Sequence, residues 1–180
     1  GAGPQPELLA AGGEFSAVGD VYANNIATWD GSAWQPLWTG INGSFPSVLA
    51  LTVYNGELIA GGRFENAGQV ECSNIARWDG LTPVVWQGFG SGLGGRVRPA
   101  FGYGGNAIVG GEFTTAGSQP ASGLARGDES TQTWSELGGN GIGVALPPLK
   151  VKNRVEALSV FSVRGLRGAH SEALLHIPLR

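Results

Sequence analysis

Methionine is absent from this 180-residue sequence, and cysteine occurs once, as Cys72. A single cysteine excludes an intrachain disulfide and a metal cluster built on cysteine ligands. Histidine is almost as scarce, because His170 and His176 are the only two and both lie near the end of the chain. Since there is no initiator methionine, we expect the sequence to be a processed chain or a piece of a longer one.

Charged side chains are also scarce, at 14% of the residues, where an average globular domain has about a quarter. No apolar run is long enough to form a membrane-spanning helix. The residues before Lys150 include 5 basic and 12 acidic side chains, whereas the segment from Lys150 onward has 6 basic and 2 acidic ones. The acidic body argues against a nucleic-acid partner, which needs clustered lysine and arginine. The basic tail is expected to be solvated or packed, and contact with phosphate or anionic lipid stays open as the alternative.

Motifs for catalysis and for cofactors are absent or incomplete. Metal sites need three or four convergent ligands, and the two histidines have only Glu172 close to them in sequence. No Gly-x-Ser-x-Gly nucleophile motif occurs. Gly90-x-Gly92-x-x-Gly95 matches a dinucleotide fingerprint formally, but strand-like residues follow it where that motif requires a helix. The sequence therefore predicts no catalytic residue, no metal site and no cofactor, and a protein that is not an enzyme.

Glycine, by contrast, is abundant at 32 residues, and much of it recurs at a fixed spacing. The segment AGGEFSAVGDVYANNIATWDG, residues 11–31, returns 49 positions later as AGGRFENAGQVECSNIARWDG, residues 60–80. A third copy, GGEFTTAG from residue 110, begins after a further 49 positions. Self-similarity at this period is typical of stacked supersecondary units, each of which cannot bury its apolar faces alone.

Each repeat is predicted to form four short strands. In the second repeat the expected strands are Val48–Tyr54, Glu57–Phe64, Ser73–Trp78 and a segment around Trp86. Asn55-Gly56 is a strong hairpin signal, and Asp79-Gly80 marks a second turn. Cys72 aligns with Ala23 and Ala121 in the other repeats, so we expect a packed thiol rather than a reactive one.

These repeats resemble the blades of a kelch-type β-propeller. A double glycine after an apolar strand, an aromatic-Asp-Gly turn about sixteen residues later and a following tryptophan carry the resemblance. The long spacer is similar to that of the glycine-rich kelch-like repeats in bacterial extracellular proteins and fungal cell-surface landmark proteins. The resemblance covers Leu8 to Leu137 and implies an all-β fold of kelch-like propeller blades, in the galactose-oxidase central-domain-like superfamily. The copper site of galactose oxidase is not implied, because Cys72 lies at a core-type position and the histidines lie in the tail.

Two regions are expected: residues 1–149 as three tandem propeller repeats of 49 residues, and residues 150–180 as a basic terminal segment. A strand at residues 155–163 is expected to pair beside Leu8–Phe15 and complete the first blade. Propellers typically need four to eight blades, so about three four-stranded blades must belong to a larger propeller or to one completed by oligomerisation. A ring of two chains with six blades is the first arrangement to consider. The tail at residues 164–180 is predicted as an extra strand or a short helix, without a choice between them.

Candidate binding residues are polar positions that vary within the fixed framework. One set lies between the glycine pair and the phenylalanine, and the other precedes the tryptophan position of each repeat. The two sets are Glu14, Arg63 and Glu112, and Thr28, Arg77 and Arg126. In a ring of blades each set would form a circle of polar groups at one radius, although ordinary surface charge and pairing between blades are the slightly favoured explanation.

Aromatic residues give one further candidate. The five other tryptophans recur with the repeat and are expected to pack between blades: Trp29, Trp34, Trp78, Trp86 and Trp134. Trp38 has no aromatic counterpart in the third repeat and is therefore the better candidate for an exposed contact, although a structural role is favoured for it because large aromatic side chains are so often buried. Arg126-Gly127-Asp128 reads as an adhesion tripeptide, but the repeat already accounts for Arg126 and Asp128, so we interpret the match as chance.

Three functions remain open at this point. The favoured one is a non-enzymatic binding or scaffold module of an extracellular or cell-surface protein, with a protein or glycan ligand and with self-association or another propeller segment as partner. The alternative is a carbohydrate-binding lectin with one site per blade. An enzyme acting at a central channel is the third and disfavoured alternative, because acid–base pairs and metal ligands do not converge in the repeats.

Overall fold

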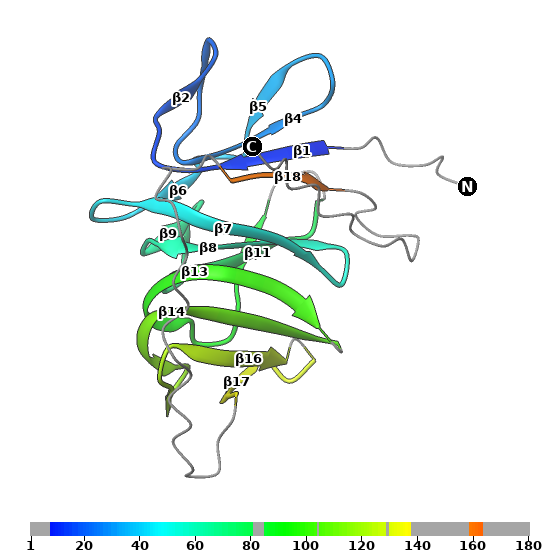
Figure 1. Cartoon of the computed structure of the whole chain (residues 1–180). Helices are drawn as coiled ribbons and strands as arrows, with labels where there is room; N and C mark the ends of the chain where they lie inside the picture. Colours follow the sequence, from blue (N-terminus) through cyan, green and yellow to red (C-terminus); the bar gives the residue numbers. More distant parts are fainter. Residues whose placement is uncertain (1–7, 81–84, 104, 129, 138–158, 164–180) are drawn as a thin grey trace, which may run out of the picture.

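The computed structural model describes residues 8–80, 85–103, 105–128 and 130–137 in full, and residues 159–163 as backbone only (Figure 1). These residues form strands, turns and bends, and no helix occurs among them. The predicted all-β class is therefore confirmed. Within the same residues no helix is available that could cross a membrane. The histidines and the predicted element at residues 164–180 lie outside the described residues.

The first blade is a four-stranded antiparallel sheet in the order β18-β1-β4-β5. Its strands are β1 (Leu8–Gly12), β4 (Ile26–Trp29), β5 (Trp34–Pro36) and β18 (Ser159–Val163). Leu8 pairs with Val163 and Gly12 with Ser159, so the last described strand of the chain forms the edge of the first sheet. A small hairpin of β2 (Ala17–Val18) and β3 (Val21–Tyr22) extends from this blade.

The second blade has the order β7-β8-β11-β12, with β7 (Ser47–Tyr54), β8 (Glu57–Arg63), β11 (Ile75–Trp78) and β12 (Trp86–Gly88). Asn55 and Gly56 have φ values of 50° and 77°, the left-handed pair that a tight two-residue hairpin requires. A three-stranded sheet of β6 (Ile41–Asn42), β9 (Asn66–Ala67) and β10 (Val70–Glu71) links the first blade to the second.

The third blade has the order β13-β14-β16-β17, with β15 (Gln119–Pro120) paired to β14. The other strands are β13 (Leu93–Tyr103), β14 (Asn106–Ala116), β16 (Leu124–Asp128) and β17 (Thr133–Glu136). Strand β13 begins directly after Gly92, so the glycines that match a dinucleotide fingerprint lead into a strand and not into a helix. This geometry lacks the helix N-terminus that would hold a pyrophosphate.

The three sheets lie one below another as layers, which is how propeller blades pack (Figure 1). One buried cluster, including Ile26, Leu51 and Trp78, fills the space between the first two blades. A second cluster, including Ile59, Val97 and Trp134, fills the space between the second and third. The result is a propeller-like stack in which each interface is formed by apolar side chains from two repeats.

The recurrence of the glycine pair at the same place in each repeat has a packing reason. A Cβ atom on Gly61 would lie 2.6 Å from Cγ1 of Val97 in the next blade, and one on Gly12 would lie 2.4 Å from Cγ1 of Val48. Adjacent blades therefore approach so closely at this position that only glycine fits without displacement.

An asparagine in each of the first two blades also connects them to the following blade. Asn74 has a φ of 66°; its Oδ1 accepts a hydrogen bond from the Phe64 amide (3.2 Å) and its Nδ2 donates to the Leu93 carbonyl (2.7 Å). Asn25 makes the same pair of bonds to Phe15 and Ile41. The third blade has Gly123 at this position, with a φ of 75° and no side chain to make the link.

The repeated tryptophans and the single cysteine behave as packed residues to different degrees. Trp78, Trp86 and Trp134 are buried, whereas Trp29 and Trp34 of the first blade are only half-buried.

Cys72 is 5% exposed, and burial raises the pKa of its thiol to about 11. A thiol with so high a pKa is protonated at neutral pH and is a poor nucleophile.

Candidate binding surface

The first predicted set of polar residues lies at equivalent positions of the repeat, in or just after the strand that carries the glycine pair. Glu14 comes just after β1, Arg63 ends β8 and Glu112 lies in β14. Glu14 is exposed. Glu112 is held by two neighbours from its own blade, because Arg98 Nη2 lies 2.9 Å and Arg96 Nη1 3.7 Å from its carboxylate. The set therefore shares a position in the repeat, but its members differ in their local partners.

The second predicted set is less uniform. Thr28 is buried, and Arg77 forms an ion pair with Glu57 (3.2 Å) and a hydrogen bond with Gln87 (2.7 Å). Arg126 is exposed. The side chain of Arg77 is only 16% exposed, which fits pairing within the blade better than contact with a ligand. Whether the exposed members bind a partner stays a prediction.

Trp38 lies in the connection between the first and second blades, which we define as residues 37–46. Its side chain is 48% exposed and its φ is 56°. The equivalent position after the second blade is Gly90, with a φ of 55°. A bulky residue at positive φ is strained, and such strain clusters at functional sites. The connection therefore has an exposed indole at a position where the second blade has glycine, the residue that adopts this positive φ without strain.

Phe45, which sequence reasoning missed, is a second exposed aromatic in the same connection. It is 78% exposed and has a φ of 57°. The Arg63 guanidinium carbon lies 5.6 Å from the centre of its ring, and Arg63 Nε donates to the Phe45 carbonyl at 2.7 Å. The signal in the sequence was the extra length between Gly43 and Val48, which has no match before Val97. Arg63 thus fixes the phenylalanine in an exposed position.

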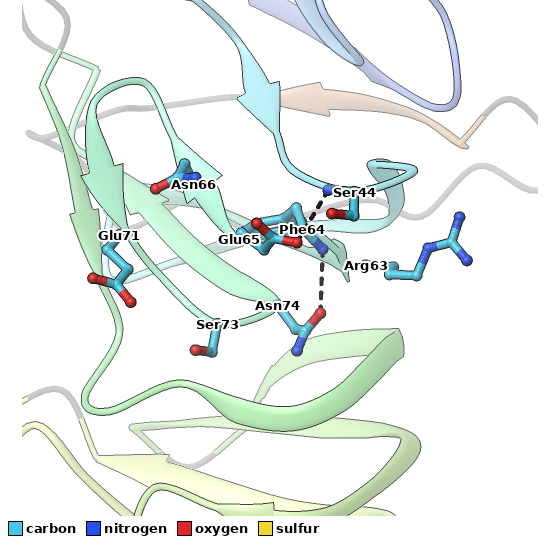
Figure 2. A pocket seen from close by; sticks show the side chains of 8 residues that line it. All are labelled: Ser44, Arg63, Phe64, Glu65, Asn66, Glu71, Ser73 and Asn74. Atoms are coloured by element: carbon cyan, nitrogen blue, oxygen red, sulfur yellow. Dashed lines mark hydrogen bonds between the residues drawn. The ribbon is translucent and has the colours of Figure 1, made fainter.

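A hollow of about 610 Å³ lies beside this connection. Figure 2 shows its lining, which comes from the connection and from the β8–β11 segment: Ser44, Arg63, Phe64, Glu65, Asn66, Glu71, Ser73 and Asn74. Glu65 accepts a hydrogen bond from the Ser44 amide (3.1 Å), so this acidic side chain holds the connection against the segment that follows β8. The carboxylate of Glu71 and the hydroxyl of Ser73 belong to the same lining (Figure 2).

This lining suits polar recognition next to aromatic contact. Carboxylates and hydroxyl groups bind donors, and exposed aromatic rings supply apolar contact area to proteins and sugars alike. Among residues 8–80, 85–103, 105–128 and 130–137, no three histidine, cysteine or acidic side chains gather closely enough to hold a metal ion. The surface therefore combines carboxylate, hydroxyl and guanidinium groups with two exposed aromatic rings.

The adhesion-like tripeptide is explained by its turn. Asp128 Oδ1 accepts hydrogen bonds from the Ser130 hydroxyl (2.6 Å), the Ser130 amide (2.8 Å) and the Thr131 amide (3.2 Å). The Ser130 hydroxyl and then the Thr131 amide hold the pKa of this carboxyl below its ordinary value. Asp30 makes the equivalent turn with Ser32 and Ala33. The aspartate serves the turn in both blades.

Comparison with known proteins gives one family. The family model described as the Rax2 C-terminal beta propeller domain matches residues 35–164, which is more than two thirds of the chain. The matched range runs from β5 of the first blade through the whole of the second and third blades. A search of curated proteins returned no match.

Proposed function

Because the chain belongs to the Rax2 C-terminal β-propeller family, we propose that it is a non-enzymatic binding and scaffold module, which presents its inter-blade connection to a partner. One observation carries the proposal: Trp38 and Phe45 are both exposed aromatics held at positive φ in that connection. Each such position costs about 1–2 kcal/mol relative to an ordinary backbone conformation. Aromatic and arginine side chains are also the residues most enriched at binding hot spots.

The setting and the type of blade belong to the same proposal. We assign the protein to the extracellular space or the cell surface, on the resemblance of its glycine-pair repeats to kelch-like repeats of surface proteins. Its partner is a protein or a glycan, and self-association or another propeller segment completes the blade stack. Fold alone does not choose among these partners, since propellers host many functions.

A lectin with one site per blade is the second candidate. The half-exposed rings of Trp29 and Trp34 offer an apolar face for a sugar in the first blade, whereas the tryptophans at the equivalent positions, Trp78, Trp86 and Trp134, are buried. The two functions differ in stoichiometry. Trp38 and Phe45 occur once, because Gly90 replaces the first and the second lies in extra sequence without a counterpart. Binding through the connection therefore predicts one site per chain, whereas a lectin of the repeated type predicts about three.

The decisive variant is Trp38→Gly. Glycine relieves the strain of a φ of 56° and occupies the equivalent position in the second blade, so stability is expected to stay within about 1 kcal/mol of the parent chain. Binding is expected to fall. A photoreactive benzophenone amino acid placed at position 45 and incubated with intact cells of the source organism should form a discrete adduct that Trp38→Gly abolishes. A panel of soluble cell-wall polysaccharides, titrated by tryptophan fluorescence, tests the glycan arm.

Two controls keep the assay specific. The same photoreactive residue at position 22 replaces Tyr22, which is 88% exposed but has no positive φ, and it should give no matching adduct. The Tyr22→Ala variant should leave every binding signal unchanged. Equal adducts from both positions, or binding unaffected by Trp38→Gly, would overturn the assignment to the connection. Three equivalent polysaccharide sites would favour the lectin instead.

A further inference from the structure

The residue three positions after the last tryptophan of each blade occupies a special place. These residues are Leu37, Phe89 and Leu137, which follow Trp34, Trp86 and Trp134 respectively. We call each of them the knob of its blade. The first two knobs are buried, at 2% and 0% exposure, whereas Leu137 is 40% exposed. Equivalent positions therefore differ in whether a following blade covers them.

The second knob shows how a covered knob packs. The ring of Phe89 lies 5.0 Å from that of Trp134 in the third blade, and Trp134 Nε1 donates a hydrogen bond to the Phe89 carbonyl (3.0 Å). Leu37, the first knob, belongs to the same buried cluster as Trp78 and Trp86 of the second blade. Each covered knob thus packs into the next blade, at a site that we call the socket and identify by the residue at the position of Trp29, Trp78 and Gly127.

Socket and knob match in size. A Cβ atom on Gly127 would lie 2.4 Å from Cε1 of Phe89, so the third blade has glycine where the second blade has Trp78. A large phenylalanine knob is accommodated by glycine, and the smaller Leu37 by tryptophan. Close packing makes such a match selective, because extra volume at one side must be removed from the other.

The first blade presents a socket of the tryptophan type. Trp29 occupies the position of Trp78 and Gly127, and its ring lies 5.5 Å from that of Trp34. Both rings are half-exposed, whereas Trp78 and Trp86 are buried at 5% and 3%. The exposed knob of the third blade is a leucine, which is the size that a tryptophan socket takes. Within the described part of the chain, the exposed surfaces of the first and third blades are therefore complementary to each other.

A second observation on the third blade supports the same reading. Tyr54 of β7 is 5% exposed, because its ring packs against Phe89 and its hydroxyl donates to the Gly105 carbonyl in the next blade. Tyr103 of β13 is the equivalent residue, 49 positions later, and is 75% exposed. The surface around Leu137 and Tyr103 therefore has the form of an interface between blades without its neighbour.

We propose that the third blade of one copy docks head-to-tail on the first blade of a second copy, with Leu137 inserted against Trp29 and Trp34. The proposal rests on the self-association proposed above and names its contact. Used twice, this contact joins two sets of three blades into a ring of six, within the usual range of four to eight. A heterologous contact that closes in this way leaves no open end for filament growth.

The test exchanges sizes across the contact. Leu137→Phe changes an exposed residue and should overfill the Trp29 socket, weakening dimerisation by about tenfold or more. Trp29→Gly alone should also weaken it. The double variant, Leu137→Phe with Trp29→Gly, copies the Phe89–Gly127 pair and should recover affinity to within about threefold of the parent chain. Light scattering gives the native mass, and sedimentation velocity over a concentration series gives the dimer Kd.

Each outcome decides something. A parent chain that is monomeric at every concentration overturns both self-association and this contact. A dimer whose Kd is unchanged by Leu137→Phe overturns the contact alone, and Leu137→Asp repeats that test without relying on the fold of Trp29→Gly. Tyr22→Ala is the control and should leave the Kd unchanged. Partner binding at Trp38 is read in the separate adduct assay, so failure there is distinguishable from failure here.

Discussion

The link that Asn74 makes between the second and third blades gives a sharp test of how the stack is stabilised. Asn74→Gly keeps the backbone at a φ of 66° without strain and removes only the hydrogen bonds to the Phe64 amide and the Leu93 carbonyl. A hydrogen bond contributes about 0.5–1.5 kcal/mol net, so the loss of two should lower the free energy of unfolding by about 2 kcal/mol. Asn74→Ala removes the same bonds and adds about 1–2 kcal/mol of left-handed strain.

Urea unfolding followed by tryptophan fluorescence measures both variants, with the slope of the transition checked for constancy. The expected order is parent chain, Asn74→Gly and then Asn74→Ala. Asn24→Ala is the matched control, because Asn24 is exposed and its side chain makes one hydrogen bond, to the Thr39 carbonyl (3.0 Å). That variant should stay within about 0.5 kcal/mol of the parent. Equal stability of the glycine variant and the parent would refute the reasoning, as would equal losses in the glycine and alanine variants.

Three further predictions concern other parts of the blades. Gly61→Ala places a Cβ atom 2.6 Å from Val97 Cγ1 and should lower the free energy of unfolding, measured in urea, by about 1–3 kcal/mol. Val97→Ala in the same chain should recover part of this free energy, and strictly additive effects of the two substitutions would contradict the contact. Burial raises the pKa of the Cys72 thiol to about 11, so a thiol reagent at pH 8 should label the protein only on unfolding, and fast labelling of the folded chain would contradict this. Cys72→Ala should change the free energy of unfolding by less than about 1 kcal/mol. Ser130→Ala removes the main cause of the lowered pKa of Asp128, so an NMR titration should show that pKa rising toward its ordinary value while Asp30 titrates as before; an unchanged pKa of Asp128 would contradict the assignment. Because the pKa of Asp128 is lowered in the folded protein, the stability that its hydrogen bonds contribute is present above the ordinary pKa and is lost as the pH falls through the folded value.

The strands of the repeat could be predicted because their signals are local. Expected strands at Val48–Tyr54 and Glu57–Phe64 correspond to β7 and β8 within one residue at each end. Asn55-Gly56 predicted the hairpin between them and Asp79-Gly80 the turn after the third strand, which was expected at Ser73–Trp78 and is observed as β11, Ile75–Trp78. The division into residues 1–149 and 150–180 and the roles of the polar sets stay predictions.

The sheet of β6, β9 and β10 was not predicted. Each of these strands has two residues, too few for any alternation to be visible, and β6 pairs with β9 from another blade. Trp38 was singled out for lacking an aromatic counterpart, but its positive φ is a property of the folded backbone. Phe45 could not be placed from the sequence, because its exposure depends on Arg63 and on the path of residues 43–46.

Gly127 shows where reasoning within one repeat reaches its limit. In the alignment of the repeats Gly127 takes the place of Trp29 and Trp78, and nothing inside the third repeat accounts for the missing ring. The cause is Phe89, which follows the last strand of the second blade and whose ring occupies the volume that a tryptophan at position 127 would need. Residues that vary between blades therefore have to be compared in pairs across the interface, with the end of one blade against the middle of the next. Compared in this way, Leu37 with Trp78 and Phe89 with Gly127 are two solutions of one packing problem, and in the docking proposed above Leu137 with Trp29 is a third.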